Sequence, residues 1–222
     1  LSGVGSPFVA PFVGSVTGQW RQDDGQTAQS PLAFGQQFFP DVEDAWRVSL
    51  HAARAHEDFA ERARALGVAT AGIHVALARV FPTGESTAED RSAARAAWGR
   101  RLDIGALREQ IEAVYAAALD VAWPESQRIH GDLHLGQAIL VPDRGWVLLD
   151  FEGEPMRPMA ERLDRDLALR DVAGMLRSFD YVAGSLTRET PAQEPVVRAW
   201  SERARSSFIE GYESTVDTGV HG

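Results

Sequence analysis

Three polar side chains in the middle of the chain have the types and spacing that phosphoryl transfer needs. Asp132 stands in the segment HGDLHLGQ, Gln137 follows it after five positions, and Asp150 opens the segment DFEG. A carboxylate such as Asp132 could accept the proton of an attacking hydroxyl group. The carboxylate of Asp150 and the amide oxygen of Gln137 are hard ligands that suit Mg²⁺. Phosphoryl transfer asks a protein mainly for positioning and charge neutralisation, which these groups could supply.

The residues between these groups are expected to hold them side by side. The pattern predicts strands at 137–141 and 146–150, joined by the turn sequence Pro142–Gly145. Such a hairpin would bring Gln137 and Asp150 together at its open end. The order and spacing match the H-R-D-x-x-x-x-N and D-F-G motifs of kinase loops, with Gln in the place of Asn.

Two other interpretations of this segment stay open. The acidic residues could simply flank an ordinary hairpin. Alternatively, His130, Asp132 and His134 alternate like the ligands of a metal hydrolase, although such enzymes need further ligand clusters. The other histidines lie in no such cluster: His51, His56, His74 and His221. We therefore expect His130 to be a structural residue of the loop.

The segments HGDLHLGQ, LLDFEGEP and LRDVAGMLRSFDYVAG together resemble the actinobacterial maltokinases and their close relatives, including glucosamine kinases. This resemblance is specific over residues 128–184, looser over 36–78 and weak elsewhere. It implies an enzyme that uses ATP and Mg²⁺ to phosphorylate a sugar hydroxyl. Maltose, giving maltose 1-phosphate, is the first acceptor that it suggests, and glucosamine is the alternative.

The same resemblance implies an α+β, mostly α fold of the protein-kinase-like, aminoglycoside-phosphotransferase-like type. Residues 1–39 are expected to be a remnant of the small β lobe with the hinge strand, and 40–222 the large helical lobe. That lobe would contain the catalytic loop 129–137 and the metal-binding hairpin 138–154. The backbone of the hinge is expected to contact adenine: Gln36, Gln37, Phe38 and Phe39.

Apolar periodicity predicts the helices of the large lobe. Asp41 or Asp44 is expected near the first helix N-terminus, and Ser86–Glu89 has the character of a capping box. In the first 39 residues, two apolar strands are expected on either side of a polar loop at 19–30. The expected helices cover about 45–60, 61–78, 90–99, 104–123, 170–184 and 195–216.

Five residues are candidates for contact with the acceptor sugar. The resemblance places Asp171 near the sugar, and capping its helix or bracing the loop is the other interpretation. Trp200, Glu202 and Tyr212 offer aromatic faces and a carboxylate, which suit a sugar ring, with core packing as the other interpretation of Trp200 and Tyr212. His134 in the loop is the fifth candidate.

Composition excludes several classes of protein. The net charge of −10 disfavours nucleic acid or an anionic membrane as a partner, and the absence of cysteine excludes disulfides and thiolate metal sites. No apolar run approaches the length of a membrane span, and the N-terminus lacks a signal pattern. A cytoplasmic protein is therefore expected.

All 22 basic residues of the chain are arginines. Kinase-fold enzymes use a small-lobe Lys and a Gly-rich loop to hold the nucleotide phosphates, and this chain shows neither. We therefore expect a fragment that lacks most of the small lobe, is inactive by itself and exposes apolar surface at Phe34, Phe38 and Phe39. The alternative of another class is a pseudokinase or nucleotide-binding module.

Overall fold

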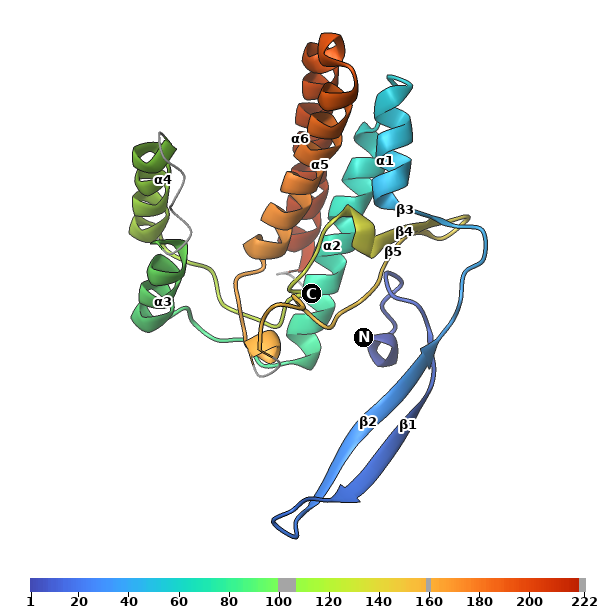
Figure 1. Ribbon diagram of the computed structural model, residues 1–222, viewed down its shortest axis with the longest axis vertical. Helices are drawn as coiled ribbons and strands as arrows, with labels where there is room; N and C mark the ends of the chain where they lie inside the picture. Colours follow the sequence, from blue (N-terminus) through green and yellow to red (C-terminus); the bar gives the residue numbers. More distant parts are fainter. Residues whose placement is uncertain (100–106, 159–160, 220–222) are drawn as a thin grey trace.

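The computed structural model describes residues 1–99, 107–158 and 161–219 (Figure 1). The helices are α1 (Ala45–Arg54), α2 (Ala60–Val80), α3 (Ala88–Gly99), α4 (Arg108–Asp120), α5 (Leu169–Glu189) and α6 (Glu194–Gly219). The strands are β1 (Phe12–Arg21), β2 (Thr27–Gln36), β3 (Glu43–Asp44), β4 (Ala138–Val141) and β5 (Gly145–Leu148). Short 3₁₀ turns include η3 (Leu135–Gln137) and η4 (Glu161–Leu163). This is the mostly helical α+β architecture that the sequence predicts.

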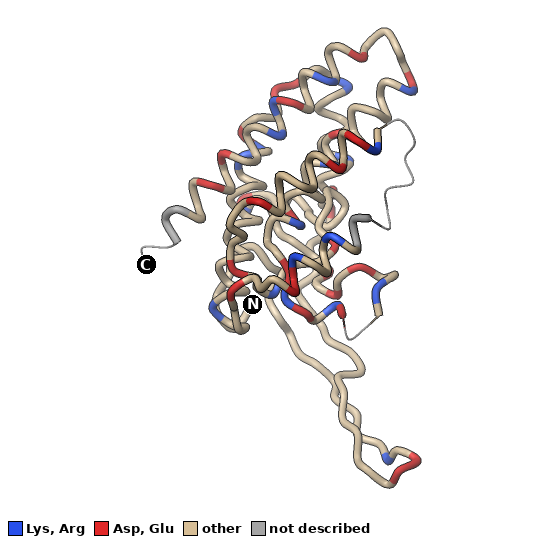
Figure 2. Tube along the Cα trace, turned by 90° about the vertical axis from the view of Figure 1, so that its left-hand side faces the viewer, with Lys and Arg blue, Asp and Glu red and all other residues tan. Residues whose placement is uncertain are grey.

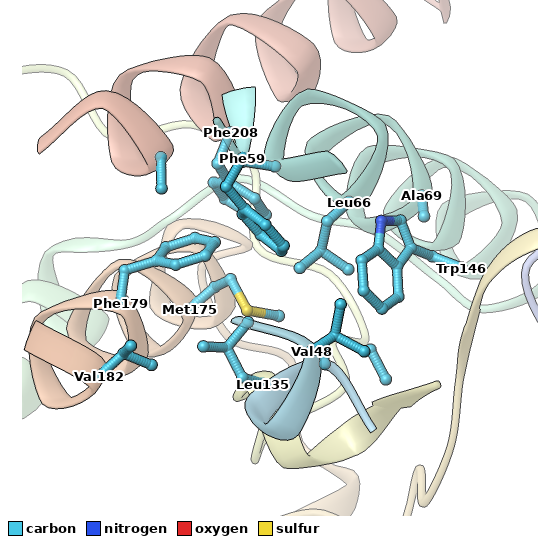
Figure 3. Close-up of a cluster of buried hydrophobic side chains, with 14 of the residues drawn as sticks. Val48, Phe59, Leu66, Ala69, Leu135, Trp146, Met175, Phe179, Val182 and Phe208 are labelled. Carbon is cyan, nitrogen blue, oxygen red and sulfur yellow. The ribbon is translucent and has the colours of Figure 1, made fainter. Parts of the chain in front are cut away.

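Helices α2, α5 and α6 form the centre of the molecule, with α1 beside them (Figure 1). Their apolar faces meet in one core, where Met175 and Leu66 are fully buried (Figure 3). Phe179 of α5 lies 6.2–6.3 Å, between ring centroids, from three aromatic neighbours: Phe59, Trp200 and Phe208. Each fully buried large side chain stabilises the fold by about 1.5–3 kcal/mol relative to exposure.

Helices α2 and α6 approach each other closely because each has a glycine at the contact. A Cβ atom on Gly67 would lie 2.0 Å from the carbonyl oxygen of Phe208, and one on Gly211 would lie 2.1 Å from that of Arg64. Real Cβ atoms do not approach so closely, so any side chain at these positions would push the helices apart. These two glycines therefore set the distance between the helices.

The small sheet carries the predicted hairpin. Strands β4 and β5 pair antiparallel, with Val141 opposite Gly145, and β3 pairs with the outer side of β4. The segment before β1 adds to the other edge, where Leu148 N–H donates to the Phe8 carbonyl at 2.8 Å. Leu149, at the open end of the hairpin, has its carbonyl oxygen 2.7 Å from His130 Nε2, so this end lies against the loop that contains the HGD sequence.

Strands β1 and β2 form a separate ribbon that extends away from the helices (Figure 1). The ribbon is longer than predicted, because residues 19–21 and 27–30, expected in a polar loop, belong to its strands. A two-stranded ribbon exposes both faces, so polar residues are no obstacle to strand pairing there. Its charged residues lie only near the tip (Figure 2): Arg21, Asp23 and Asp24.

The ribbon and hinge expose apolar side chains, as expected. Phe34 is 64% exposed and Phe38 is 82% exposed. Phe39, the third residue expected to be exposed, is half-buried instead, because it packs on the cluster around Val141 and lies under the Arg144 guanidinium at 5.5 Å. Contact with the β4–β5 sheet therefore removes this ring from solvent.

Several helix boundaries differ from the sequence expectation. Helix α1 ends at Arg54 rather than near residue 60, because the chain turns at His56, whose φ is 55°. Asp44 is the N-cap of α1, as one of the two predicted options, and accepts from Arg47 N–H at 2.8 Å. Residues 104–106 of the helix expected at 104–123 lie outside the described residues, and α4 itself ends at Asp120.

The capping box at the start of α3 is shifted by one residue. Thr87 Oγ1 accepts from Asp90 N–H at 3.1 Å, and Asp90 accepts from Thr87 N–H at 2.7 Å. The predicted pair was Ser86 with Glu89, which has the same spacing. Ser86 instead donates to the Pro124 carbonyl, so its side chain serves the loop after α4.

Among the described residues, α2 is long and apolar enough to cross a membrane by length and composition. The apolar pattern of the sequence predicted no such span. Ten residues of α2 are buried in the folded protein, and the helix packs along α6. This burial is typical of the core helix of a globular protein.

Candidate active site

The hairpin brings the two predicted metal ligands together. Gln137 ends η3, directly before β4, and Asp150 follows β5. The Gln137 amide donates from Nε2 to Asp150 Oδ2 at 3.2 Å. A backbone bond from Leu149 N–H to the Gln137 carbonyl, at 2.8 Å, closes the hairpin beside them. The sequence pattern therefore predicted the correct neighbours.

Two loops meet at this open end through glycines with left-handed backbone. Gly131 and Gly153 have φ values of 89° and 78°, and a Cβ on Gly131 would lie 3.3 Å from the Cα of Gly153. Asp150 also has a positive φ of 57°, which costs a non-glycine residue roughly 1 kcal/mol or more. Strain of this kind concentrates at functional sites, where the surrounding contacts maintain it.

His130 is a structural residue of the loop, as expected. It is fully buried, its Nε2 lies 2.7 Å from the Leu149 carbonyl, and its Nδ1 accepts weakly from Asp132 N–H at 3.4 Å. Burial lowers the pKa of His130, which favours the neutral ring that this pattern requires. The ring also packs on Phe151, with 4.8 Å between centroids.

These contacts count against the metal hydrolase. Both ring nitrogens of His130 face backbone partners, and His134 Nδ1 accepts from Gly136 N–H at 3.0 Å. Within the part of the chain that the structure describes, no three His, Asp or Glu residues are grouped as a metal site. His134 consequently shapes the loop here, and its contact with a sugar stays a prediction.

Asp171 holds the backbone of the HGD loop through hydrogen bonds. Its Oδ2 accepts from His130 N–H at 2.7 Å and lies 3.0 Å from His74 Nε2, and its Oδ1 accepts from Gly131 N–H at 3.0 Å. Burial raises the pKa of Asp171, but the His74 hydrogen bond and the nearby charges outweigh it and hold the pKa below the ordinary value. The carboxylate is thus ionised, and both of its oxygens have hydrogen-bond partners.

These contacts decide between the local roles of Asp171. The side chain is 1% exposed, and the N-cap residue of α5 is Ala168, where no side chain caps the helix, so Asp171 does not cap it. Gly174, one turn later, allows α5 to approach the loop, because a Cβ there would lie 2.4 Å from the Leu133 carbonyl. Direct contact between Asp171 and a sugar stays a prediction.

Trp200 and Glu202 lie apart from the loop. Trp200 is 2% exposed, packs on Phe59 and donates to the Glu57 carbonyl at 3.1 Å, so it is a core residue. Glu202 lines a shallow polar hollow of about 450 Å³ between α5 and α6, together with Asp180. Asp180 is nine residues after Asp171 on α5, roughly 13 Å along the helix. The structure does not bring these two candidates to Asp132.

The expected hinge borders a second cavity. Gln36 ends β2, and Gln37 N–H donates to the Pro11 carbonyl at 2.8 Å. A cavity of about 290 Å³ lies between this strand and the DFEG segment, and its lining includes Gln36, Phe151 and Arg128. The hinge strand and the DFEG segment therefore share one hollow.

Arg170 was given no role in the sequence analysis, yet it binds two carboxylates that follow the DFEG segment. Its guanidinium donates to Glu154 at 2.8 Å and to Asp166 at 2.9 Å. A basic residue preceding Asp171 was visible in the sequence, but its partners come from a segment without periodic pattern. Only the folded chain shows which carboxylates it meets.

Comparison with known proteins identifies relatives over most of the chain. The profile of the Phosphotransferase enzyme family matches residues 27–208. The chain is similar to a glucosamine kinase of Streptacidiphilus jiangxiensis, with 35% identity over 169 residues, which is 68% of this chain and 37% of the relative. A glucosamine kinase of Mycolicibacterium smegmatis is 33% identical over 118 residues, which is 53% of this chain and 29% of the relative.

Solved structures show the same likeness. A glucosamine kinase in complex with glucosamine, ADP and inorganic phosphate superimposes with a TM-score of 0.78 and 28% identity, covering 96% of this chain and 54% of that chain. Another crystal form of a glucosamine kinase gives a TM-score of 0.79, also at 28% identity, covering 97% and 55%. The chain thus spans from about a third to about half the length of these relatives.

Proposed function

We propose that this chain, which belongs to the phosphotransferase enzyme family, is the large lobe of an ATP-dependent kinase that phosphorylates a hydroxyl group of glucosamine. The observation that carries the proposal is the meeting of Gln137 and Asp150, at 3.2 Å, beside the loop of Asp132. The relatives named above are glucosamine kinases, which favours glucosamine as the acceptor. Maltose, the first expectation from the sequence, has no support among them.

Asp132 is the proposed general base. Within the described residues, its carboxylate has no hydrogen bond or ion pair, so it is available to accept a proton. As the sugar hydroxyl oxygen forms its bond to the γ-phosphorus of ATP, the bond from that phosphorus to the β–γ bridging oxygen breaks. The hydroxyl proton passes to Asp132, and ADP leaves.

Gln137 and Asp150 have the donor set that fits Mg²⁺. A carboxylate and an amide oxygen are both hard ligands, and the two side chains already lie together. Bound there, Mg²⁺ would neutralise charge on the nucleotide phosphates. The Gln137 amide donates its N–H to Asp150 in this structure. To bind a cation, the amide group would have to rotate so that its oxygen faces the ion, which needs no change of the backbone.

The nucleotide is proposed to lie against the hinge strand. Gln36 and Phe151 line one cavity there, and Gln37–Phe39 directly follow Gln36 in the chain. Because all basic residues of this chain are arginines, we propose that a Lys and a Gly-rich loop come from residues beyond it. The pseudokinase is the alternative if no such lobe exists.

A phosphorylation screen of the full-length protein that contains this chain tests the proposal. The acceptors are glucosamine, maltose, glucose and N-acetylglucosamine, in which the amine is blocked. Turnover of glucosamine with ATP and Mg²⁺ is expected. Turnover of maltose alone would overturn the acceptor, and nucleotide binding without any turnover would favour the pseudokinase.

A further inference from the structure

One arginine in the turn of the β4–β5 hairpin contacts the chain on both sides of the β1–β2 ribbon. The Arg144 guanidinium donates to the Pro7 carbonyl from Nε at 3.2 Å and from Nη2 at 3.0 Å, and Nη2 also donates to the Val9 carbonyl at 2.7 Å. Both carbonyls come shortly before β1. The same guanidinium lies 5.5 Å from the ring centroid of Phe39, three residues after β2. Arg144 therefore joins the chain that enters the ribbon and the chain that leaves it to the hairpin.

Two further contacts hold the segment that enters the ribbon. Leu148 N–H of β5 donates to the Phe8 carbonyl at 2.8 Å, and Val9 forms a parallel bridge with Leu148. The Phe8 ring lies against Gly72 of α2, where a Cβ atom would come within 2.3 Å of the ring. Residues 7–9 are thus fixed to the turn of the hairpin, to its second strand and to α2.

The expected hinge is held from two sides. Gln37 N–H donates to the Pro11 carbonyl at 2.8 Å, which closes the base of the ribbon. Phe39 packs on the apolar cluster around Val141 in addition to its contact with the guanidinium. Between these two attachments lies Phe38, which is 82% exposed. The ribbon and the hairpin together consequently fix the backbone of the hinge.

A guanidinium is the side chain that suits this position. It is planar and always charged, and its five N–H donors can reach two carbonyl oxygens while its face lies on an aromatic ring. A Lys ammonium keeps the charge but has no planar face, and a Gln amide has two N–H donors and no charge. The contacts of Arg144 given above are to carbonyl oxygens and a ring, so they connect it to the backbone of the small-lobe segment.

We propose that Arg144 is a positioning residue for the nucleotide. The hairpin carries Arg144 at its turn and Gln137 and Asp150 at its open end, separated by strands of four residues, about 13 Å. Arg144 fixes the hinge, through Phe39 and residues 7–9, where adenine is proposed to bind. The pair at the open end serves the phosphates independently. The inference rests on the proposed function because it takes a nucleotide as the ligand.

Hydrogen exchange in the full-length protein tests these contacts without any ligand. Arg144→Gln should speed exchange of the Leu148 and Gln37 amides by about tenfold, because their acceptors, the Phe8 and Pro11 carbonyls, belong to the segment that loses its attachment. Unchanged exchange at both amides would overturn the proposal.

Two comparisons separate this local effect from general unfolding. The Leu149 amide donates to the Gln137 carbonyl at the open end of the hairpin and should exchange at the wild-type rate. Arg47→Gln, at a 69% exposed arginine side chain of α1, should change none of the three amides. Equally fast exchange at Leu149 in Arg144→Gln would mean that the whole hairpin opens, and it would contradict a positioning role.

Calorimetric titration of the full-length protein with ADP, in EDTA and in Mg²⁺, tests the effect on the nucleotide. Arg144→Gln should raise the Kd of ADP about tenfold under both conditions, so that the gain in affinity on adding Mg²⁺ is kept. Asp150→Asn should do the reverse and mainly lose that gain. Arg144→Lys should lie between the wild type and Arg144→Gln, since it keeps the charge over Phe39.

The outcomes distinguish the inference from the proposed function. A wild type that binds no ADP would defeat the proposed function. A wild type that binds ADP, with an unchanged Kd in Arg144→Gln, would defeat the inference alone. Loss of the Mg²⁺ gain in Arg144→Gln would show that the variant disturbs the open end of the hairpin, and it would likewise overturn the assignment to the hinge.

Discussion

Two carboxylates of the proposed catalytic site differ in burial and in hydrogen bonding. Asp171 is buried and ionised, with both oxygens accepting hydrogen bonds, so it holds the backbone of the loop. Asp132 is partly exposed and, among the described residues, its carboxylate has no such partners. The same residue type is thus a support in one place and a proposed proton acceptor in the other.

Replacing Asp132 by Asn should lower kcat by on the order of 10²-fold or more, because the amide cannot accept the hydroxyl proton. Nucleotide affinity should be largely kept. Steady-state kinetics and calorimetric titration with ADP, in the full-length protein, give both values. Asp143→Asn, in the exposed turn of the hairpin, is the control and should change neither. A kcat near that of the wild type would remove Asp132 from the mechanism.

Replacing Asp150 by Asn should selectively weaken nucleotide binding that depends on Mg²⁺. Asn tolerates the left-handed backbone at this position, so the loop should keep its shape. We expect the gain in ADP affinity on adding Mg²⁺ to shrink at least about tenfold, since a neutral amide replaces a charged ligand. Calorimetry with Mg²⁺ and with EDTA measures that gain. An undiminished gain would place the cation elsewhere.

The stability of the chain should depend on pH through His130. Burial holds the pKa of His130 in the folded state below its ordinary value of 6.5, so the unfolded state binds the proton more readily. The contribution of the neutral ring is therefore fully present above pH 6.5 and is lost as pH falls through the lower, folded pKa. Urea unfolding between pH 8 and pH 5 measures it. Constant stability across this range would contradict the assignment.

At the scale of elements, two helix contacts depend on the absence of side chains. Gly67 and Gly211 let α2 and α6 touch, and Gly174 lets α5 approach the loop. The approach of α5 places Asp171 under the loop, and that of α2 and α6 places Tyr212 beside His74. Small residues in the core helices consequently control the geometry of the site.

Replacing Gly211 by Ala should lower the free energy of unfolding by about 1–3 kcal/mol, because the new methyl group would collide with the Arg64 carbonyl. Gly184→Ala is the matched control on α5, since a Cβ there meets nothing within 4 Å. That change should stabilise the helix by about 0.5–1 kcal/mol. Chemical denaturation compares the two. A neutral Gly211→Ala would mean that the two helices do not touch at this glycine.

At the scale of the whole molecule, the ribbon of β1 and β2 stands out from the helical body (Figure 1). Its large apolar residues are exposed, among them Phe34 at 64% and Val16 at 60%. Apolar patches of this kind mark surfaces that bind another part of a protein. This agrees with the expectation that residues 1–39 belong to a small lobe, which stays a proposal.

The 222-residue chain by itself should bind ATP weakly and phosphorylate no sugar, because it supplies neither a Lys nor a Gly-rich loop for the phosphates. Full-length protein and isolated chain, assayed in parallel with glucosamine, provide the comparison. Robust turnover by the isolated chain would show that an Arg replaces the phosphate-binding Lys.

The local sequence by itself determined the hairpin that brings Gln137 and Asp150 together, the general order of helices and the structural role of His130. These features depend on contacts between residues near in the chain, where turn residues and periodicity carry the information. The sequence analysis did not predict that α1 ends at Arg54 or that the ribbon extends to Arg21 and Thr27. Helix ends and strands exposed on both faces leave only weak patterns of apolar residues in a sequence.

Only the tertiary structure decided how the site is supported. Asp171 meets His130 across 41 positions, and His74 meets Tyr212 across 138. No local pattern specifies such pairs, because they depend on how closely three helices pack. The same packing placed Trp200 in the core, a choice that residue type alone left open. The candidate chemistry could therefore be proposed from spacing, whereas the positions of the candidate groups depend on long-range contacts that form only when the helices pack together.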